Sequence, residues 1–152
     1  MDRTLHGPDR QVVSKAVGYV IQNEKLLVFT HDDVPITVTG VQVPAGTIEQ
    51  TESPEDAVVR EVFEETGVAV RIVTPFGIAL YDVWPSKPEI HERHFFHLEP
   101  LQKIDAESWS AGELDPSDGG ASQRWTCHWM PIAQAHVLCA GFGAKLGEVE
   151  LN

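Results

Sequence analysis

The chain has little cysteine, few basic residues and no long hydrophobic run. Its two cysteines, Cys127 and Cys139, form no CxxC pair, which argues against a disulfide scaffold and favours a reducing compartment. No apolar stretch approaches the roughly 18 residues that a membrane-spanning helix needs. Residues 1–11 are polar and lack the apolar region of a signal peptide, so we expect a cytoplasmic protein with no membrane partner.

Basic residues are scarce relative to acidic ones, because 11 Lys and Arg face 23 Asp and Glu for a net charge of −12. This imbalance argues against nonspecific binding to nucleic acid or to an anionic membrane, since both need a basic surface. An anionic substrate would need metal ions or a local basic pocket in order to approach. The 152 residues and 42% apolar content indicate one globular domain with a substantial core.

Most of the chain has the pattern of β-strands. Strands are expected over residues 12–21 and 25–30, which form a hairpin, and over 36–43, 68–84, 91–99 and 124–130. The strand over 68–84 is expected to bend near Pro75 and Gly77, and residues 44–46 break the strand before them. The polar residues 101–122 predict a long surface loop. Pro131 is expected to start a second helix that runs to Cys139, followed by a loosely ordered tail.

The strongest local signal is a helix over residues 54–66. Ser53 is a candidate N-cap, and Asp56 three residues later completes a capping-box pattern. Pro54 occupies the first helical position, where its missing N–H costs nothing. Gly67 follows the last helical residue, as expected of a C′ position.

This helix has an apolar face and an acidic face. Four apolar side chains share an arc of roughly 140° and are expected to face a core: Val58, Val59, Val62 and Phe63. Three carboxylates lie on the other side, within about 100° of arc: Glu61, Glu64 and Glu65. Like charges so close together repel, so a hard divalent cation with oxygen ligands is the natural candidate to bind them.

Three more positions join the acidic face. Glu52 lies just before the helix and can reach its N-terminal end. Gly46 ends a Pro-Ala-Gly loop, where another group can approach the backbone closely. Arg60, one turn before Glu64, can hold that carboxylate by an i, i+4 ion pair. Several oxygen donors around a cation position suit Mg²⁺, which also bridges to substrate phosphate oxygens.

The spacing of these residues is that of the Nudix box, G-x5-E-x7-R-E-U-x-E-E-x-G-U, where U is aliphatic. Every fixed position is satisfied, by Gly46, Glu52, Arg60, Glu61, Val62, Glu64, Glu65, Gly67 and Val68. The chain therefore resembles the Nudix hydrolase family. The resemblance implies an α/β fold, the Nudix α/β/α sandwich around a mixed β-sheet. We expect a flexible N-terminal arm over residues 1–11, a Nudix hydrolase domain over 12–140 and a C-terminal tail over 141–152.

The family cleaves the pyrophosphate linkage of a nucleoside diphosphate linked to another moiety, with Mg²⁺ or Mn²⁺ as cofactor. By resemblance, Glu61, Glu64 and Glu65 ligate the metal and the Gly46 carbonyl joins them. Glu52 is then a supporting acid and Arg60 orients a carboxylate. The residue that deprotonates the water varies within the family. Glu61 is one candidate, and the candidates outside the box are Glu89, Glu92, Glu107 and Glu113.

Residues outside the box leave alternatives open. Arg93 can contact phosphate or can simply balance surface charge. Trp109, in the expected polar loop, can face substrate or be structural. His91, His94 and His97 cannot share one ion on a strand, because His94 points away from the other two.

The complete box favours an enzyme over the alternative, a Nudix-fold nucleotide sensor or scaffold without hydrolytic activity. A Ca²⁺-binding module is disfavoured because the D-x-D-x-D-G loop spacing is absent. Nucleoside triphosphates, nucleotide sugars and dinucleotides all remain open as small-molecule substrates. Pro85 lies near the offset that the family links to ADP-ribose, and many relatives form homodimers.

Overall fold

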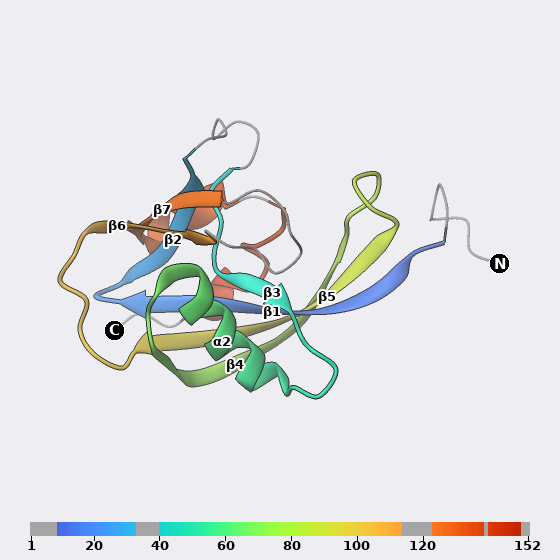
Figure 1. The fold of residues 1–152 in the computed structure, drawn as a ribbon, viewed down its shortest axis with the longest axis horizontal. Helices are drawn as coiled ribbons and strands as arrows, with labels where there is room; N and C mark the ends of the chain where they lie inside the picture. The colour runs from blue at the N-terminus through green and yellow to red at the C-terminus, as the bar shows by residue number, and fades with distance from the viewer. Residues whose placement is uncertain (1–8, 33–39, 114–122, 139, 150–152) are drawn as a thin grey trace.

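A computed structural model describes residues 9–32, 40–113, 123–138 and 140–149 (Figure 1). Seven strands form one mixed sheet in the order β4-β5-β1-β2-β7-β6, and β3 pairs with β1. The strands are β1 (Gln11–Gln22), β2 (Lys25–His31), β3 (Ala45–Thr47), β4 (Val70–Asp82), β5 (Glu89–Pro100), β6 (Ser108–Glu113) and β7 (Gln123–Pro131). The pair β1–β5 is parallel, and the other pairs are antiparallel.

Helix α2 (Pro54–Thr66) crosses one face of the sheet in front of β1 and β4 (Figure 1). Its bounds confirm the sequence prediction. The Ser53 side chain accepts a hydrogen bond from the Asp56 N–H, and Gly67 adopts the left-handed conformation, with φ of 78°. These two ends fix where the helix begins and stops, and so fix the turn on which each acidic residue lies.

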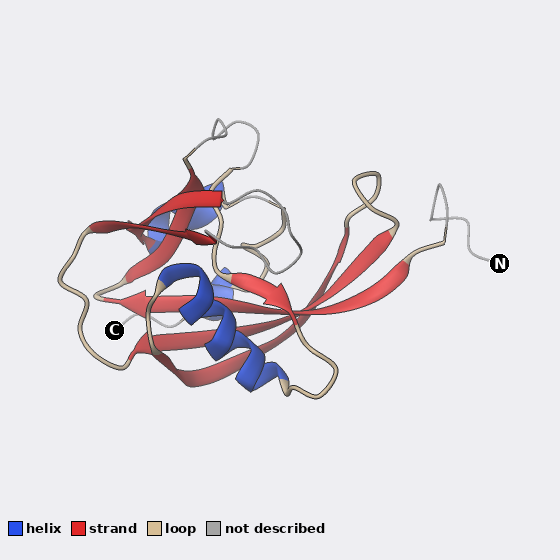
Figure 2. Cartoon of the chain, in the orientation of Figure 1, coloured by secondary structure: helices blue, strands red, loops and turns tan. Residues whose placement is uncertain are grey.

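The sheet separates two hydrophobic clusters. On the face of α2, buried residues of the helix pack against β1 and β5: Ala57, Val58, Val62, Ala16, Val20, Phe96 and Leu98. On the opposite face, Val17, Tyr19 and Phe95 pack against η1 (Ile132–Val137) and residues 142–149. Figure 2 shows these short helical segments behind the strands, on the side away from α2. The mixed sheet with helical cover confirms the predicted α/β class.

Several sequence predictions differ from the structure. The predicted loop over 101–122 contains strand β6, because residues 108–113 pair with β7. The second helix is the 3₁₀ helix η1 and ends at Val137. Residues 44–46 do not simply break a strand, since Ala45 and Gly46 pair with β1. Residues 142–149 are not loosely ordered as predicted, because Phe142 packs against the second cluster together with Leu146 and Val149.

The predicted apolar face of the helix is confirmed for Val58, Val59 and Val62 and is wrong only for Phe63. Phe63 is 58% exposed, while Ala57 and Thr66 are buried alongside Val58 and Val62. The bend in β4 is confirmed by register shifts near Pro75 and Gly77. Residues 1–8 and 150–152 lie outside the described residues, so the predicted domain boundaries remain predictions. Within the described ranges, no helix is long and apolar enough to cross a membrane.

Candidate active site

Arg60 lies at the centre of a network of carboxylates on helix α2. Its Nε and one terminal nitrogen donate to the two carboxylate oxygens of Glu52, at 2.7 and 2.8 Å. The other terminal nitrogen donates to Glu61 Oε1 at 2.8 Å and to Glu64 Oε2 at 3.2 Å. The guanidinium also donates to the Thr47 carbonyl at 3.2 Å, which ties the helix to strand β3. One side chain therefore orients three carboxylates, as the sequence predicted for one of them.

Glu52 is the anchor of this network. Its carboxylate accepts both parallel hydrogen bonds from Arg60 and a third from the Glu49 N–H at 3.0 Å. Bidentate pairing of this kind is the strongest form of arginine–carboxylate contact. The hydrogen bonds from Arg60 lower the pKa of Glu52 to about 2, so Glu52 stays ionised throughout the physiological range.

Gly46 lies directly against the Glu61 carboxylate. A Cβ atom on Gly46 would fall well inside van der Waals contact with the carboxylate carbon and both oxygens of Glu61. The missing side chain is therefore what lets this carboxylate reach the backbone of β3. Burial raises the pKa of Glu61 above its ordinary value, against the opposing attraction of Arg60.

Glu65 contacts strand β3 and strand β7 at once. Its side chain accepts a hydrogen bond from the Ala45 N–H at 2.8 Å, and its backbone carbonyl accepts one from the Trp125 indole at 2.7 Å. The next carbonyl, of Thr66, accepts from the Trp109 indole at 2.8 Å. Two tryptophans thus satisfy carbonyls that the C-terminal turn of a helix leaves without partners. Trp109 lies in β6 and not in a loop, and its contacts are structural.

The donor set suits a hard divalent cation. Glu61, Glu64 and Glu65 are carboxylates on one side of the helix, beside the backbone of Gly46, and oxygen donors of this kind are what Mg²⁺ and Mn²⁺ prefer. Among the described residues, no three His, Cys, Asp or Glu side chains already converge on one point. The reason is visible in the network, where the oxygens of Glu61 and Glu64 are directed at Arg60.

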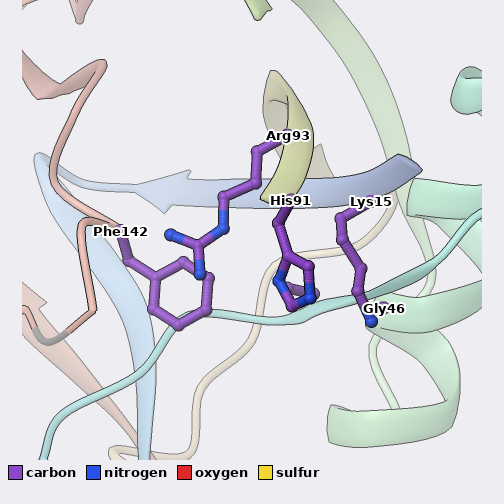
Figure 3. A pocket seen from close by; sticks show the side chains of 6 residues that line it. Lys15, Gly46, His91, Arg93 and Phe142 are labelled. Carbon is purple, nitrogen blue, oxygen red and sulfur yellow. The ribbon is translucent and has the colours of Figure 1, made fainter. Parts of the chain in front are cut away.

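A cavity of about 160 Å³ opens beside Gly46 (Figure 3). Its lining residues come from β1, β3, β5 and the C-terminal segment: Lys15, Ala45, Gly46, His91, Arg93 and Phe142. Arg93 is only 5% exposed. The alternative that Arg93 balances charge on the protein surface is therefore wrong. Lys15 and Phe142 were not predicted. A lysine within an otherwise apolar strand was the one signal that could have indicated Lys15.

The alternative bases lie in different surroundings. Glu89 contacts His91 Nε2 at 2.9 Å, and Glu92 contacts His94 Nε2 at 3.3 Å. Glu107 is exposed beside a second surface cavity that includes Lys103. The side chain of Glu113 lies outside the described residues. None of these contacts joins the Arg60 network, so the assignment of the base remains a prediction.

A model of the NUDIX domain family matches residues 13–147. The chain belongs to the NUDIX domain family. An RNA pyrophosphohydrolase of Cereibacter sphaeroides is 35% identical over 68 residues, which are 45% of this NUDIX chain and 41% of the relative. The match thus spans less than half the length of that relative.

Solved structures show the same fold as this NUDIX chain. A NUDIX hydrolase from Nitrosomonas europaea has a TM-score of 0.64 and 20% identity, and the comparison covers 91% of this chain and 87% of that one. An ADP-ribose pyrophosphatase from Streptococcus suis has a TM-score of 0.59 and 18% identity, covering 89% and 87%. These likenesses confirm the predicted fold, and the family model confirms the predicted family.

Proposed function

We propose that this NUDIX chain is a divalent-metal-dependent hydrolase that cleaves the pyrophosphate linkage of a small nucleoside diphosphate derivative. The observation that carries the proposal is the Arg60 network. Arg60 contacts Glu52, Glu61 and Glu64, and Glu61 lies against Gly46, at the spacing of the complete box. A solvated acidic face has no need for one arginine to orient three carboxylates.

In this proposal Glu61, Glu64 and Glu65 hold Mg²⁺ or Mn²⁺ together with the Gly46 carbonyl. When bound, such a cation neutralises phosphate charge and lowers the pKa of coordinated water. The chain's own residues do the positioning. Glu52 fixes Arg60, and the β3 backbone N–H of Ala45 fixes the Glu65 carboxylate. Glu61 is the candidate base because its side chain is only 14% exposed and its carboxylate lies against the backbone of Gly46 in β3.

The finer predictions from the sequence belong to the same proposal. A small-molecule substrate agrees with the net charge of −12, and a cytoplasmic location and a homodimer remain predictions. The relative from Cereibacter sphaeroides is named for RNA, which makes an RNA substrate a necessary member of any panel. Turnover of RNA alone would overturn the predicted absence of a nucleic-acid partner.

The decisive experiment compares Glu65→Gln with the wild type on a panel of nucleotide derivatives with Mg²⁺ and with Mn²⁺. Glutamine keeps an oxygen that can accept from Ala45, so the fold is retained while one charged ligand is lost. We expect kcat to fall roughly a hundredfold or more, the scale on which misplacement of reacting groups lowers a rate. Glu55→Gln is the matched control, because Glu55 is an exposed residue in the first turn of the same helix.

Full activity in Glu65→Gln would refute the assigned site. If the wild type binds nucleotides but releases no product from any substrate, the alternative of a nucleotide sensor or scaffold without hydrolytic activity is favoured. Product analysis of the released phosphates separates these outcomes directly.

A further inference from the structure

The last turn of helix α2 carries two of the proposed metal ligands at the end of the helix where negative charge is least favourable. Residues 63–66 include Glu64 and Glu65 and have no Lys, Arg or His among them. A helix C-terminus has a partial negative charge, so carboxylates there are destabilising and a cation is attracted. The turn can bind a cation best if the groups that hold it in place add no positive charge of their own.

Two neutral indole donors hold this turn. The Trp125 Nε1–H donates to the Glu65 carbonyl at 2.7 Å, and the Trp109 Nε1–H donates to the Thr66 carbonyl at 2.8 Å. Lys and Arg side chains can also fill this role at a helix end, but either would bring a full positive charge toward the carboxylates. An indole N–H satisfies a carbonyl and carries no charge. The turn thus keeps its negative potential for a cation.

Trp125 is itself fixed by the sheet. It lies in β7 directly opposite His31 of β2, and its side chain belongs to the hydrophobic cluster on the α2 face. Its ring stacks on Phe29, with the ring centroids 5.2 Å apart, and meets the His31 ring edge-on at 5.3 Å. Only 6% of Trp125 is exposed. Because a ring packed in this way cannot turn freely, the sheet sets the position of its N–H.

Glu65 is consequently held at two points. Its carboxylate accepts a hydrogen bond from the Ala45 N–H of β3, and its backbone carbonyl accepts the one from Trp125 of β7. Both the backbone and the side chain of Glu65 are therefore tied to the sheet. If the contact to the backbone is lost, the last turn can shift, and the carboxylate is no longer held at a fixed distance from the other proposed ligands.

Resting on the proposed function, we propose that Trp125 is a positioning residue for the metal site. Its indole N–H fixes the backbone of Glu65, so that the Glu65 carboxylate is presented to Mg²⁺ or Mn²⁺ in one orientation. Removing a group that orients a metal ligand typically lowers metal affinity or activity by roughly 10–100-fold. Trp125 contacts neither the metal nor the substrate in this proposal, and it acts through Glu65.

Metal binding in the absence of substrate tests the proposal. Mn²⁺ is titrated into the wild type and into Trp125→Phe, and the free Mn²⁺ is measured by electron paramagnetic resonance. We expect the Kd for Mn²⁺ to rise roughly 10–100-fold in Trp125→Phe, because the phenyl ring has no N–H for the Glu65 carbonyl. The half-saturating Mg²⁺ concentration for hydrolysis should rise by the same factor.

Thr66→Val is the matched control. The Thr66 hydroxyl donates to the Val62 carbonyl at 2.7 Å and accepts from the Val68 N–H at 3.2 Å, so this variant also loses buried hydrogen bonds at the end of α2. The loss destabilises the fold, as it does in Trp125→Phe, but it leaves the Glu65 carbonyl with its donor. The Kd for Mn²⁺ should therefore be unchanged in Thr66→Val.

A second variant keeps the volume of the ring. Benzothienylalanine introduced at position 125 has a sulfur atom in place of the indole N–H and otherwise nearly the same shape, so the packing against Phe29 and His31 is retained. We expect it to weaken Mn²⁺ binding as Trp125→Phe does. A role in packing alone would leave the Kd of this variant at the wild-type value.

The possible outcomes separate the positioning role from the hydrolase proposal. An unchanged Kd in the benzothienylalanine variant, equal changes in Trp125→Phe and Thr66→Val, or a wild type that binds no Mn²⁺ would overturn the positioning role. Mn²⁺ binding that depends on Trp125, in a protein that releases no product, would uphold the positioning role and refute the hydrolase proposal. Hydrolysis that is lost in Glu65→Gln, with normal Mn²⁺ binding in both position-125 variants, would do the reverse.

Discussion

The substitution Gly46→Ala is expected to lower catalytic turnover strongly and the stability of the fold only slightly. The new Cβ would overlap the Glu61 carboxylate, which must swing away from the β3 backbone. Because that carboxylate is the end of a flexible side chain, the protein accommodates the methyl group at a cost of about 1 kcal/mol, the low end for overpacking. For a chain of this length, that lowers Tm by roughly 2–4 °C.

The effect on turnover is expected to be much larger. A carboxylate displaced by about 1 Å from its working position can lower a rate roughly a hundredfold. We therefore expect kcat/KM of Gly46→Ala to fall by about that factor, which is about 2.7 kcal/mol of transition-state stabilisation. Calorimetric melting and initial rates with Mg²⁺ on the same preparations provide the two numbers.

Two other glycines calibrate the result, because the same Gly→Ala change removes the same backbone freedom from the unfolded chain. A Cβ on Gly18 would lie 2.8 Å from Leu98 Cδ1 and 3.0 Å from Val62 Cγ2, within the core. Gly18→Ala should therefore lose stability, by about 1–3 kcal/mol. Apart from its chain neighbours, no atom lies within 4 Å of a Cβ on Gly147, so Gly147→Ala should leave turnover unchanged and raise stability by about 0.4–1 kcal/mol through the unfolded chain alone. Wild-type turnover by Gly46→Ala, or a Tm loss as large as that of Gly18→Ala, would refute the reasoning.

Three further outcomes are expected. Arg60→Lys should lower kcat roughly 10–100-fold in a rate assay, because an ammonium cannot hold Glu52 bidentately while it also contacts Glu61 and Glu64. Trp125→Phe should lower the unfolding free energy by about 1–3 kcal/mol in urea titrations, because it leaves the Glu65 carbonyl without its donor. Arg10 lowers the pKa of Asp82, so that pair stabilises the fold above pH about 3.9, and the stabilisation is lost as pH falls through the folded-state pKa. The difference in unfolding free energy between wild type and Asp82→Asn should shrink below that pH.

Each of these expectations has a contrary result. An unchanged rate in Arg60→Lys would mean that the bidentate contact is dispensable. Trp129→Phe is the control for Trp125→Phe, because the Trp129 indole donates to Ala106 near the surface. Equal losses in the two tryptophan variants would show that ring volume matters and the hydrogen bond to the helix does not. If the unfolding free energies of wild type and Asp82→Asn differ by the same amount from pH 7 to pH 3, Asp82 does not stabilise the fold through its charge.

Helix α2 could be predicted because its signals are local. The Ser53 cap, Pro54 and Gly67 all act within one turn of the helix ends, and the structure has the same bounds. The sequence was a poorer guide to which residues of the helix are buried, because Phe63 lies at the edge of the apolar arc. Which marginal residue is covered depends on where β1 and β5 lie under the helix.

Strand β6 and the register of β1 with β5 show why the remainder of the fold was missed. Polar and apolar residues alternate only over Ser108–Ala111, a run too short to predict a strand by itself, and the strand forms by pairing with β7. The opposition of Lys15 and Arg93 depends on the parallel register of β1 and β5, whose strands are far apart in sequence. Long-range pairing of this kind leaves no pattern within any short window, so the register could not be predicted from the sequence.

The two indoles on the last carbonyls of α2 give the protein an optical probe of its own. Trp125 and Trp109 donate directly to the backbone of Glu65 and Thr66, the end of the turn that carries two of the acidic residues. Indole emission responds to the hydrogen bonding of its N–H and to the polarity around its ring. Any ligand that shifts this turn therefore changes the intrinsic fluorescence, and titrations of cations or nucleotides can be followed without a label.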